Sequence, residues 1–478
     1  MPFNLLKKNW GGLTTLGACL GILILANPVD IVATIILLMA VGSIGIWQIR
    51  KLTAVCNDAN LSALEYFWLI KLPLSMILIA VVWAPEIYSA GDLILTYDPI
   101  RYFYQSLALV KNDWQFHGGM NSTGILYYYG VIFFILGHNP FISALVNILV
   151  TLLVITVTIY WMYGFVQKSL GKKYKLIYLI LIPDFLWFDC LTSRESIAAW
   201  LILLIVISTG ELFYRNHSPV KKIILLILCI LAMGLLFLVR STMLLPIALL
   251  LIITILFLPL PKRLSLFTKA FIILAILVTL GLRPVMLAKT GSLTLGWLGT
   301  LNTLTHVDRN VPASTAAWGD RSIGKLLTPT SIEKAALFLP VRMFVYLVAP
   351  LPNIPISDRM LKTNNYGLWQ NGLSVLTGLL CIILFPLSLV SFIYSFKSRY
   401  ENPLQLHIHI AFWLVWATIA GGNLIIQERY RVMMLPLFFI TVWLGYICCD
   451  KKTISTAYKV WIALLLIGLL FLYLYRTY

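Results

Sequence analysis

Charged residues are scarce in this chain. Asp, Glu, Lys and Arg make up 11% of its 478 residues, whereas 60% of the residues are hydrophobic. Soluble domains carry about 25% charged residues, so the composition argues against water as the main solvent. A membrane is the expected environment, and no soluble domain of ordinary size is left once the apolar runs are assigned to spans.

The seven cysteines form no pattern that predicts disulfides or a metal site. None of them forms a CxxC pair, and all except Cys56 lie in or at the ends of apolar runs. Cysteines in such places behave as small apolar core residues. We therefore expect neither a disulfide framework nor a metal centre.

The chain also lacks the short motifs of soluble catalysis. It has no GxxxxGK followed by Ser or Thr, no HExxH and no DxD signature in a soluble catalytic domain. Nucleotide use on the cytoplasmic side therefore has no visible site, no cofactor is indicated, and use of a divalent metal is left open. No strong internal repeat is present, which argues against a transporter with two inverted halves.

Long apolar runs dominate what is there. Runs such as Ile31–Trp47 and Ile223–Val239 recur along the whole chain and are continuous rather than alternating. A helix needs roughly 20 apolar residues to cross a bilayer, and continuous runs indicate helices rather than barrel strands. The sequence predicts an all-α, polytopic integral membrane bundle that forms a single domain over residues 1–478.

The runs predict about 13 transmembrane helices. They lie near residues 11–27, 31–49, 64–84, 141–166, 174–190, 196–213, 221–239, 242–260, 267–283, 371–396, 404–422, 431–449 and 458–475. Two further apolar stretches, Thr123–Gly137 and Ala336–Ala349, are only about 15 residues long, which is short for a span.

Basic residues orient the spans. The net charge of +18 would suggest nucleic acid in a soluble protein, but here the basic residues cluster in short loops between spans. If neither short stretch crosses, the groups fall on the side of Lys7 and Lys8, which is the cytoplasm. They are Arg50–Lys51, Lys168–Lys175, Arg215–Lys222, Lys262–Lys269, Lys397–Arg399 and Lys451–Lys459. We therefore expect no nucleic-acid partner, an uncleaved first span, a cytoplasmic N-terminus and two interfacial helices at the outer face.

This topology leaves two long segments outside the membrane. Residues 85–140 form a first outer loop with interfacial helices, and residues 283–363 form a long outer loop. A connection of roughly 80 residues is far above the usual length and is usually functional or disordered. The aromatic and apolar content of the second loop argues against simple disorder, so we expect it to cover a cavity at the outer face.

Asp98 is the first candidate for chemistry. It opens the run Asp98-Pro99-Ile100-Arg101-Tyr102 in the first outer loop, and His117 and an aromatic cluster follow. An Asp before a surface helix with Pro at its first position can be a helix cap. It can also be a general base that accepts a proton from a hydroxyl. The two roles are compatible.

Arginines in the outer turns work against the positive-inside bias, so orientation does not explain their presence. Four of them come from three turns, and they are Arg194, Arg240, Arg429 and Arg431. Guanidinium groups match the geometry of phosphate. We therefore expect these arginines to hold an anionic lipid headgroup such as a pyrophosphate, with support from Arg101, Tyr102, His117, Glu195, Arg342 and Glu428.

Three more ionisable residues lie within apolar runs. Lys71 sits inside a span beside Pro73, and Asp184 and Asp189 lie near the outer end of another span. Ionisable groups at membrane depth are costly and usually face a partner or a cavity. Lys71 is expected to snorkel or to pair between helices, and the two aspartates to pair with arginines or to act as caps and interface residues.

These residues together resemble the GT-C superfamily of membrane glycosyltransferases, which use polyprenyl-phosphate sugars. The resemblance rests on Asp98-x-x-x-Tyr102, on Gly118-Gly119 to Tyr129, on a span beginning at Asn139-Pro140, and on Glu428-Arg429-Tyr430-Arg431 with Pro436 after it. The last cluster is also similar to that of O-antigen and exopolysaccharide polymerases. The resemblance implies a GT-C-like fold, Asp98 as the catalytic base, and outer arginines that hold undecaprenyl pyrophosphate.

The expected function is therefore transfer of a sugar or oligosaccharide from an undecaprenyl-(pyro)phosphate-linked donor to a glycan or lipid acceptor. It would take place at the outer face of a bacterial inner membrane, in cell-surface polysaccharide biosynthesis, with membrane lipids as the other partners. The alternative is a lipid-linked oligosaccharide flippase or other transporter, which would need charged groups at several depths along a central path. A scaffold of an envelope assembly is the third candidate.

Reporter fusions test the predicted topology. A fusion after Asn216 lies between the two short stretches, so it is cytoplasmic if Thr123–Gly137 does not cross and external if it does. We expect green fluorescent protein to fluoresce there and alkaline phosphatase to be inactive. If both short stretches cross, only the three basic groups between them move outside, so a fusion after Arg399 is cytoplasmic whether neither or both cross and serves as the control. Active phosphatase after Asn216 would overturn the predicted topology.

Overall fold

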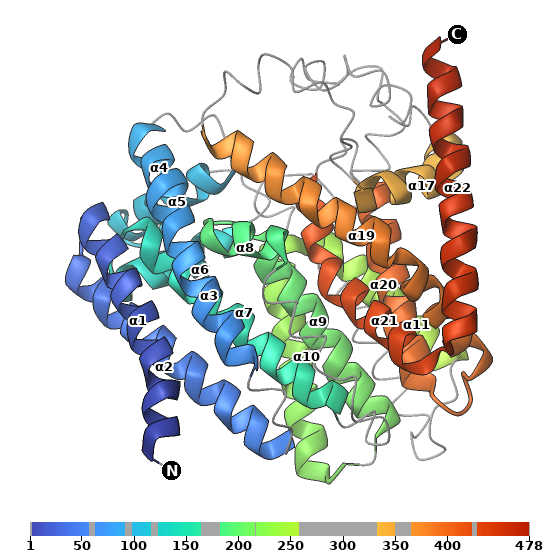
Figure 1. The fold of residues 1–478 in the computed structure, drawn as a ribbon, viewed down its shortest axis with the longest axis horizontal. Helices are drawn as coiled ribbons and strands as arrows, with labels where there is room; N and C mark the ends of the chain where they lie inside the picture. Colours follow the sequence, from blue (N-terminus) through green and yellow to red (C-terminus); the bar gives the residue numbers. More distant parts are fainter. Residues whose placement is uncertain are drawn as a thin grey trace.

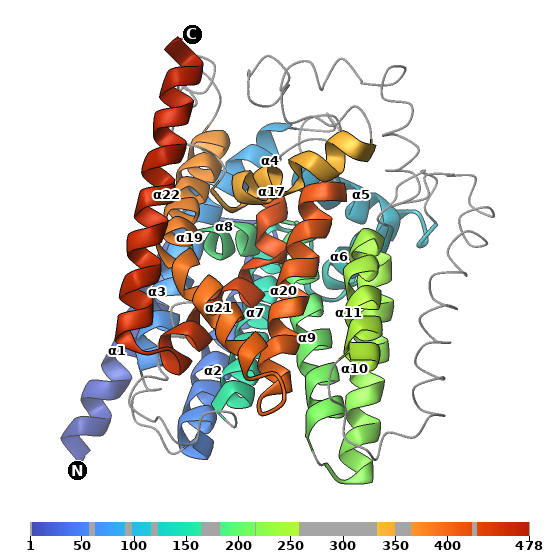
Figure 2. The ribbon, with the colours of Figure 1, turned by 90° about the vertical axis from the view of Figure 1, so that its right-hand side faces the viewer.

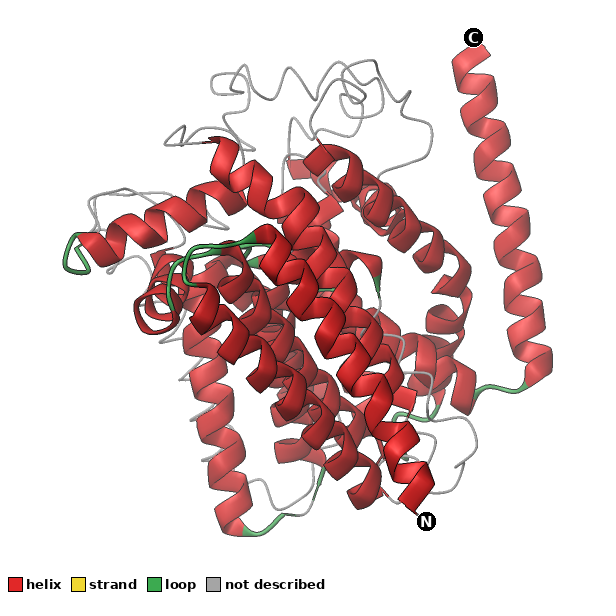
Figure 3. Cartoon of the chain, turned by 60° about the vertical axis from the view of Figure 1, so that its left-hand side comes forward, coloured by secondary structure: helices red, strands yellow, loops and turns green. Residues whose placement is uncertain are grey.

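A computed structural model of the chain describes residues 2–56, 63–90, 98–115, 123–163, 182–215, 217–257, 332–348, 365–422 and 428–477. Every regular element in these ranges is a helix (Figure 3). The predicted span 267–283, His117 and most of the long outer loop lie outside the described residues.

The helices follow the chain from the N-terminus to the C-terminus. They are α1 Pro2–Ala26, α2 Ile31–Cys56, α3 Ala63–Leu78, η2 Ile79–Trp83, α4 Ala84–Ala90, α5 Asp98–Lys111, α6 Thr123–Leu136, α7 Pro140–Tyr163, α8 Pro183–Cys190, α9 Glu195–Tyr214, α10 Pro219–Arg240, η4 Ser241–Met243, α11 Leu244–Phe257, α17 Ile332–Val348, α19 Asn365–Lys397, α20 Pro403–Gly422, η5 Glu428–Met433, α21 Leu435–Cys448 and α22 Lys451–Thr477.

Several of these helices have the length and apolar character of membrane spans. Among the described residues, seven are long and apolar enough to cross a membrane. One of the seven, Pro219–Ile255, bends at η4, so that α10 and α11 run in opposite directions. Large apolar side chains such as Ile223, Ile227 and Leu231 lie exposed on the outside of α10, as lipid-facing residues do. The predicted membrane bundle is confirmed at this level, and the count of 13 spans stays a prediction.

The bundle has two chemically different ends (Figure 1). At the lower end lie the N-terminus and several basic residues, among them Arg50 near the end of α2, Arg215 after α9, Lys221 at the start of α10, Lys397 at the end of α19 and Lys451 at the start of α22. At the upper end lies α5. Thr192 joins the α8–α9 turn to α5, Arg429 joins η5 to α5, and Arg240 joins the α10–α11 turn to the start of α9, so these segments lie at the same end. The basic groups 168–175 and 262–269 lie outside the described residues.

The short helix α6 stays at the upper end. Near its start, Gly124 lies against Leu238 at the upper end of α10, where a Cβ on residue 124 would collide with the Leu238 side chain. After its last residue, Gly137 adopts φ +99° and lies against Asp30 in the α1–α2 turn. Both ends of α6 therefore meet turns at the same end of the bundle, as expected for an interfacial helix.

Helix α17 lies across the upper end of α20 (Figure 2). Trp416 on α20 donates its indole N–H to the carbonyl of Met343, and Arg342 donates to the carbonyl of Ala420 at 2.8 Å. Trp416 and Ala420 both belong to the last two turns of α20. The second short apolar stretch is thus also placed at the upper end, over the bundle.

The predicted span 174–190 is not one continuous helix. Helix α8 begins at Pro183, and Ile182 before it is extended, with ψ 127°. Proline disfavours a helical conformation of the residue before it, which accounts for the break. The eight residues of α8 are too few to cross a membrane, and Figure 1 shows α8 lying across the bundle.

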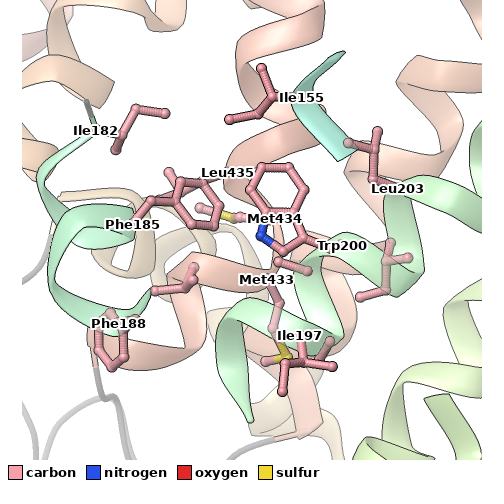
Figure 4. Packing of buried hydrophobic residues seen from close by; sticks show 14 of the residues in the cluster. Ile155, Ile182, Phe185, Phe188, Ile197, Trp200, Leu203, Met433, Met434 and Leu435 are labelled. Carbon is pink, nitrogen blue, oxygen red and sulfur yellow. The ribbon is translucent and has the colours of Figure 1, made fainter. Parts of the chain in front are cut away.

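A dense apolar core fixes α8, α9 and the segment after η5 to one another (Figure 4). Phe185 of α8 stacks on Trp200 of α9 with ring centroids 4.8 Å apart. Met433 and Met434 are fully buried against these helices. This packing brings the start of α9 and η5 to neighbouring positions at the upper end.

A buried ion pair links α3 to α8. The Lys71 ammonium lies 2.7 Å from the Asp189 carboxylate, and both side chains are completely buried. Thr151 donates to the other oxygen of Asp189 at 2.9 Å and accepts from the indole of Trp200. Lys71 therefore pairs between helices, because a lone charge at this depth would be strongly destabilising.

The pair is a testable element of the fold. We expect Lys71→Met to lower the free energy of unfolding by about 3–5 kcal/mol, because it leaves the Asp189 carboxylate buried and unpaired. The double variant Lys71→Met/Asp189→Asn should recover most of this loss. Glu65→Gln, in a pair whose Arg50 is 48% exposed, should cost about 0–1 kcal/mol. Equal losses for Lys71→Met and Glu65→Gln in detergent unfolding would contradict this account.

Candidate functional site

Eight side chains from four elements form a closed ring at the upper end of the bundle. In this ring, which we call the arginine ring, each arginine contacts one carboxylate and one tyrosine ring among its described members. In order of contact the members are Asp98, Arg429, Tyr430, Arg240, Glu195, Arg194, Tyr102 and Arg101.

Asp98 is clamped between two guanidiniums on the accessible side of the ring. Its Oδ2 lies 2.6 Å from Nη1 of Arg429, and its Oδ1 lies 2.6 Å from Nη2 of Arg101. The side chains of Asp98 and Arg429 are each 22% exposed. Both carboxylate oxygens are therefore engaged, at a place that a ligand from outside the bundle can reach.

Glu195 pairs with the other two arginines on the buried side of the ring. Its Oε1 lies 3.5 Å from Arg240 and 3.6 Å from Arg194, and it is 3% exposed. Arg240 is stacked over the Tyr430 ring at 4.5 Å, and Arg194 over the Tyr102 ring at 5.8 Å. Arg194, Arg240 and Arg429, which the sequence predicted as phosphate ligands, are thus brought together.

The ring carries excess positive charge. Four guanidiniums and two carboxylates give +4 − 2 = +2, and the two tyrosines add only the negative faces of their π-systems. Among the described residues, the Nε–H groups of Arg101 and Arg240 are buried and have no hydrogen-bond acceptor. Positive charge and unused donors suit a multiply charged anion such as a phosphate or pyrophosphate.

The arginines set the protonation of Asp98. Burial raises the pKa of the Asp98 carboxyl, but the guanidiniums of Arg429, Arg101 and Arg194 outweigh it and hold that pKa below its ordinary value. Asp98 is therefore a carboxylate at neutral pH. It is also a weak base for as long as both guanidiniums stay in contact with it.

The α8–α9 turn is held in place by hydrogen bonds from three helices. The hydroxyl of Thr192 donates to the carbonyl of Pro99, which joins this turn to the start of α5. Tyr129 of α6 donates to the carbonyl of Ser193 at 2.8 Å, and Asn147 of α7 donates to the carbonyl of Leu191 at 3.0 Å. These bonds fix Arg194 and Glu195 relative to Asp98.

Arg431 is not part of the arginine ring. It is completely buried, and its Nη2 lies 2.8 Å from the Asp184 carboxylate. It also donates to the carbonyls of Ser374 on α19 and Leu347 on α17. Residues two apart in a helix of three residues per turn point in different directions, which is why Arg429 and Arg431 diverge in η5. Arg431 anchors η5 to α8, α17 and α19.

Arg342, another predicted support residue, lies outside the ring. Arg342 is 1% exposed and bonds to the carbonyl of Ala420. Glu428 begins η5, and only its backbone belongs to the described structure. His117 lies outside the described residues.

Tyr430 is a member of the ring for which no role was predicted from the sequence. Its ring lies between the guanidiniums of Arg240 and Arg429, and its hydroxyl accepts a hydrogen bond from Nη2 of Arg429 at 3.2 Å. A tyrosine next to outer-turn arginines was the available signal, because aromatic faces separate and hold guanidiniums.

The fold and its apolar helices define a multi-pass helical membrane protein. Comparisons with models of known protein families, with curated proteins and with solved structures each gave no match. Within the described part of the chain, no three or more His, Cys, Asp or Glu residues are grouped so as to hold a metal ion.

The clamp on Asp98 predicts a pH-dependent contribution to stability. Because the pKa of Asp98 is lowered in the folded protein, its ion pairs stabilise the fold above the ordinary aspartate pKa of about 4 and are lost as the pH falls below it. We expect Asp98→Asn to melt at a lower temperature than the wild type at pH 7, and the difference to shrink below pH of about 4.

The control is Asp113→Asn, which changes an exposed aspartate in the turn after α5. Asn tolerates the positive φ at this position, so its melting temperature should follow the wild type's throughout. A difference between wild type and Asp98→Asn that is unchanged from pH 7 to pH 3 would contradict the pairing.

Proposed function

We propose that this protein is a glycosyltransferase or glycan polymerase of the bacterial inner membrane. It transfers a sugar or oligosaccharide from an undecaprenyl-(pyro)phosphate-linked donor to a glycan or lipid acceptor at the outer face, in the synthesis of a surface polysaccharide. The observation that carries the proposal is the arginine ring, in which two carboxylates lie among four guanidiniums at the end of the bundle opposite the basic turns.

The ring supports a phosphorylated lipid as donor. Its positive excess lies at the end of apolar helices, where a polyprenyl chain can stay in the membrane while its headgroup reaches the arginines. Arg194, Arg240 and Arg429 would hold the phosphate, since guanidiniums match its oxygens in geometry and charge. Arg431 contributes by holding η5, and with it Arg429, in place.

Asp98 would be the base, and binding of the donor would free it from its ion pair with Arg429. Arg429 is the ion-pair partner of Asp98 in the ligand-free protein and is also a proposed phosphate ligand. A dianionic phosphate competes with the carboxylate for this guanidinium, and losing one guanidinium raises the basicity of Asp98. In this scheme the base becomes effective only once the donor is bound, which favours donor binding before acceptor binding.

The transfer itself is a displacement at the anomeric carbon. The acceptor oxygen forms a bond to that carbon, and the bond from the carbon to the phosphate oxygen breaks, with its electron pair left on the phosphate. The acceptor proton moves to Asp98. The guanidiniums stabilise the charge that develops on the leaving phosphate.

The flippase alternative predicts a charged path through several depths. Two buried ion pairs, Lys71–Asp189 and Arg431–Asp184, do lie within the bundle, but each is neutral as a pair and completely buried. Among the described residues of the site, the excess positive charge lies in the arginine ring at one end of the bundle. An enzyme acting at one face therefore fits better than a transporter.

A glycan assay in the source cells tests the proposal. With Asp98→Asn or Arg429→Ala as the only copy, we expect surface glycan to fall about 100-fold or more, because a base or a charge-stabilising group is removed. Lipid-linked precursor should accumulate on the outer leaflet. The matched control is Arg399→Ala, which removes an arginine at the lower end and should leave the glycan unchanged.

The location of the precursor separates the alternatives, provided that each variant inserts at wild-type level. Precursor on the cytoplasmic leaflet would instead support a flippase. Wild-type glycan from both Asp98→Asn and Arg429→Ala would show that the arginine ring does not carry the function.

A further inference from the structure

Tyr430 occupies a special position in the arginine ring. Its aromatic face is shared by two guanidiniums, with Arg240 at 4.5 Å and Arg429 at 5.1 Å from the ring centroid. Both of these arginines are proposed phosphate ligands. The tyrosine hydroxyl therefore lies in the same part of the site as the groups that would hold the donor.

The Tyr430 hydroxyl still has a proton that it can donate. Nη2 of Arg429 donates to the phenolic oxygen at 3.2 Å, which uses one of its lone pairs and not its proton. Among the described residues, that proton has no acceptor in a carbonyl, carboxylate or hydroxyl. A tyrosine O–H beside buried cations usually finds an acceptor, and a bound phosphate would supply one.

The surrounding charge strengthens this donor. Burial raises the pKa of the Tyr430 phenol, but the guanidiniums of Arg429, Arg240 and Arg194 outweigh it and lower that pKa below its ordinary value. A phenol polarised in this way donates a stronger hydrogen bond to an anion.

We propose that the hydroxyl of Tyr430 is a direct ligand of the donor, and that it donates a hydrogen bond to the phosphate oxygen that leaves when the sugar is transferred. The inference rests on the proposed function and adds a catalytic residue to it. As the bond from the anomeric carbon to that oxygen breaks and the electron pair stays on the oxygen, the hydrogen bond shortens. Tyr430 keeps its proton, and the acceptor proton goes to Asp98.

The competing role for Tyr430 is that of a spacer. In that role only its aromatic face matters, because it separates Arg240 from Arg429 and offsets their repulsion. Tyr430→Phe distinguishes the two roles, since phenylalanine keeps the face for both guanidiniums and removes only the hydroxyl.

The experiment measures binding of undecaprenyl pyrophosphate to the purified full-length chain, with undecaprenol as the uncharged probe. We expect Tyr430→Phe to weaken undecaprenyl pyrophosphate about 10- to 100-fold, the size of the loss of one hydrogen bond to a charged group, and to leave undecaprenol unchanged. Its melting temperature should equal the wild type's. The control Tyr104→Phe removes a hydroxyl that donates to the carbonyl of Ile87 and should bind both probes normally.

The outcomes separate this inference from the proposed function. If Tyr430→Phe binds undecaprenyl pyrophosphate like the wild type while Arg240→Ala loses it, Tyr430 is a spacer, the inference is wrong and the proposed function stands. If the wild type binds undecaprenyl pyrophosphate no better than undecaprenol, both are overturned.

Discussion

Mutual repulsion among four guanidiniums is the constraint on which the site depends. Arg101, Arg194, Arg240 and Arg429 would drive one another apart without compensation, and each is offset by one carboxylate and one tyrosine face. Among the eight members of the ring, the guanidiniums outnumber the carboxylates by two. A cluster of described side chains with this excess of positive charge is suited to binding an anion.

The bundle supplies the rigidity that this arrangement needs. The ring draws on α5, α9, α10 and η5, whose positions are fixed by contacts outside the ring. The bond from Thr192 to Pro99 joins α5 to the α8–α9 turn, and the buried pair of Arg431 with Asp184 joins η5 to α8. Removing one partner of such a pair leaves an isolated buried charge, so the anchors under the ring matter to it as much as its own members.

Much of the fold could be read from the sequence, because spans are set by length and apolarity. Predicted spans 31–49, 196–213 and 404–422 correspond to α2, α9 and α20. Asp98, Arg194, Arg240 and Arg429 belong to one cluster at one end of the bundle, as predicted. The rest depended on tertiary contacts. Arg431 and Asp184 are 247 positions apart, and Tyr430 contacts Arg240 with the face of its ring. The break at Pro183 shortened a helix that apolarity alone predicted to be continuous.

The central claim is that Arg429 is shared between Asp98 and the donor phosphate. It is tested most directly by an experimental structure of the full-length chain in lipid nanodiscs, with and without undecaprenyl pyrophosphate. We expect the ligand phosphate to lie within hydrogen-bond distance of Arg194, Arg240 and Arg429, and the Asp98–Arg429 separation to be longer than the ligand-free 2.6 Å. Phosphate bound elsewhere, with this ion pair intact, would contradict the claim.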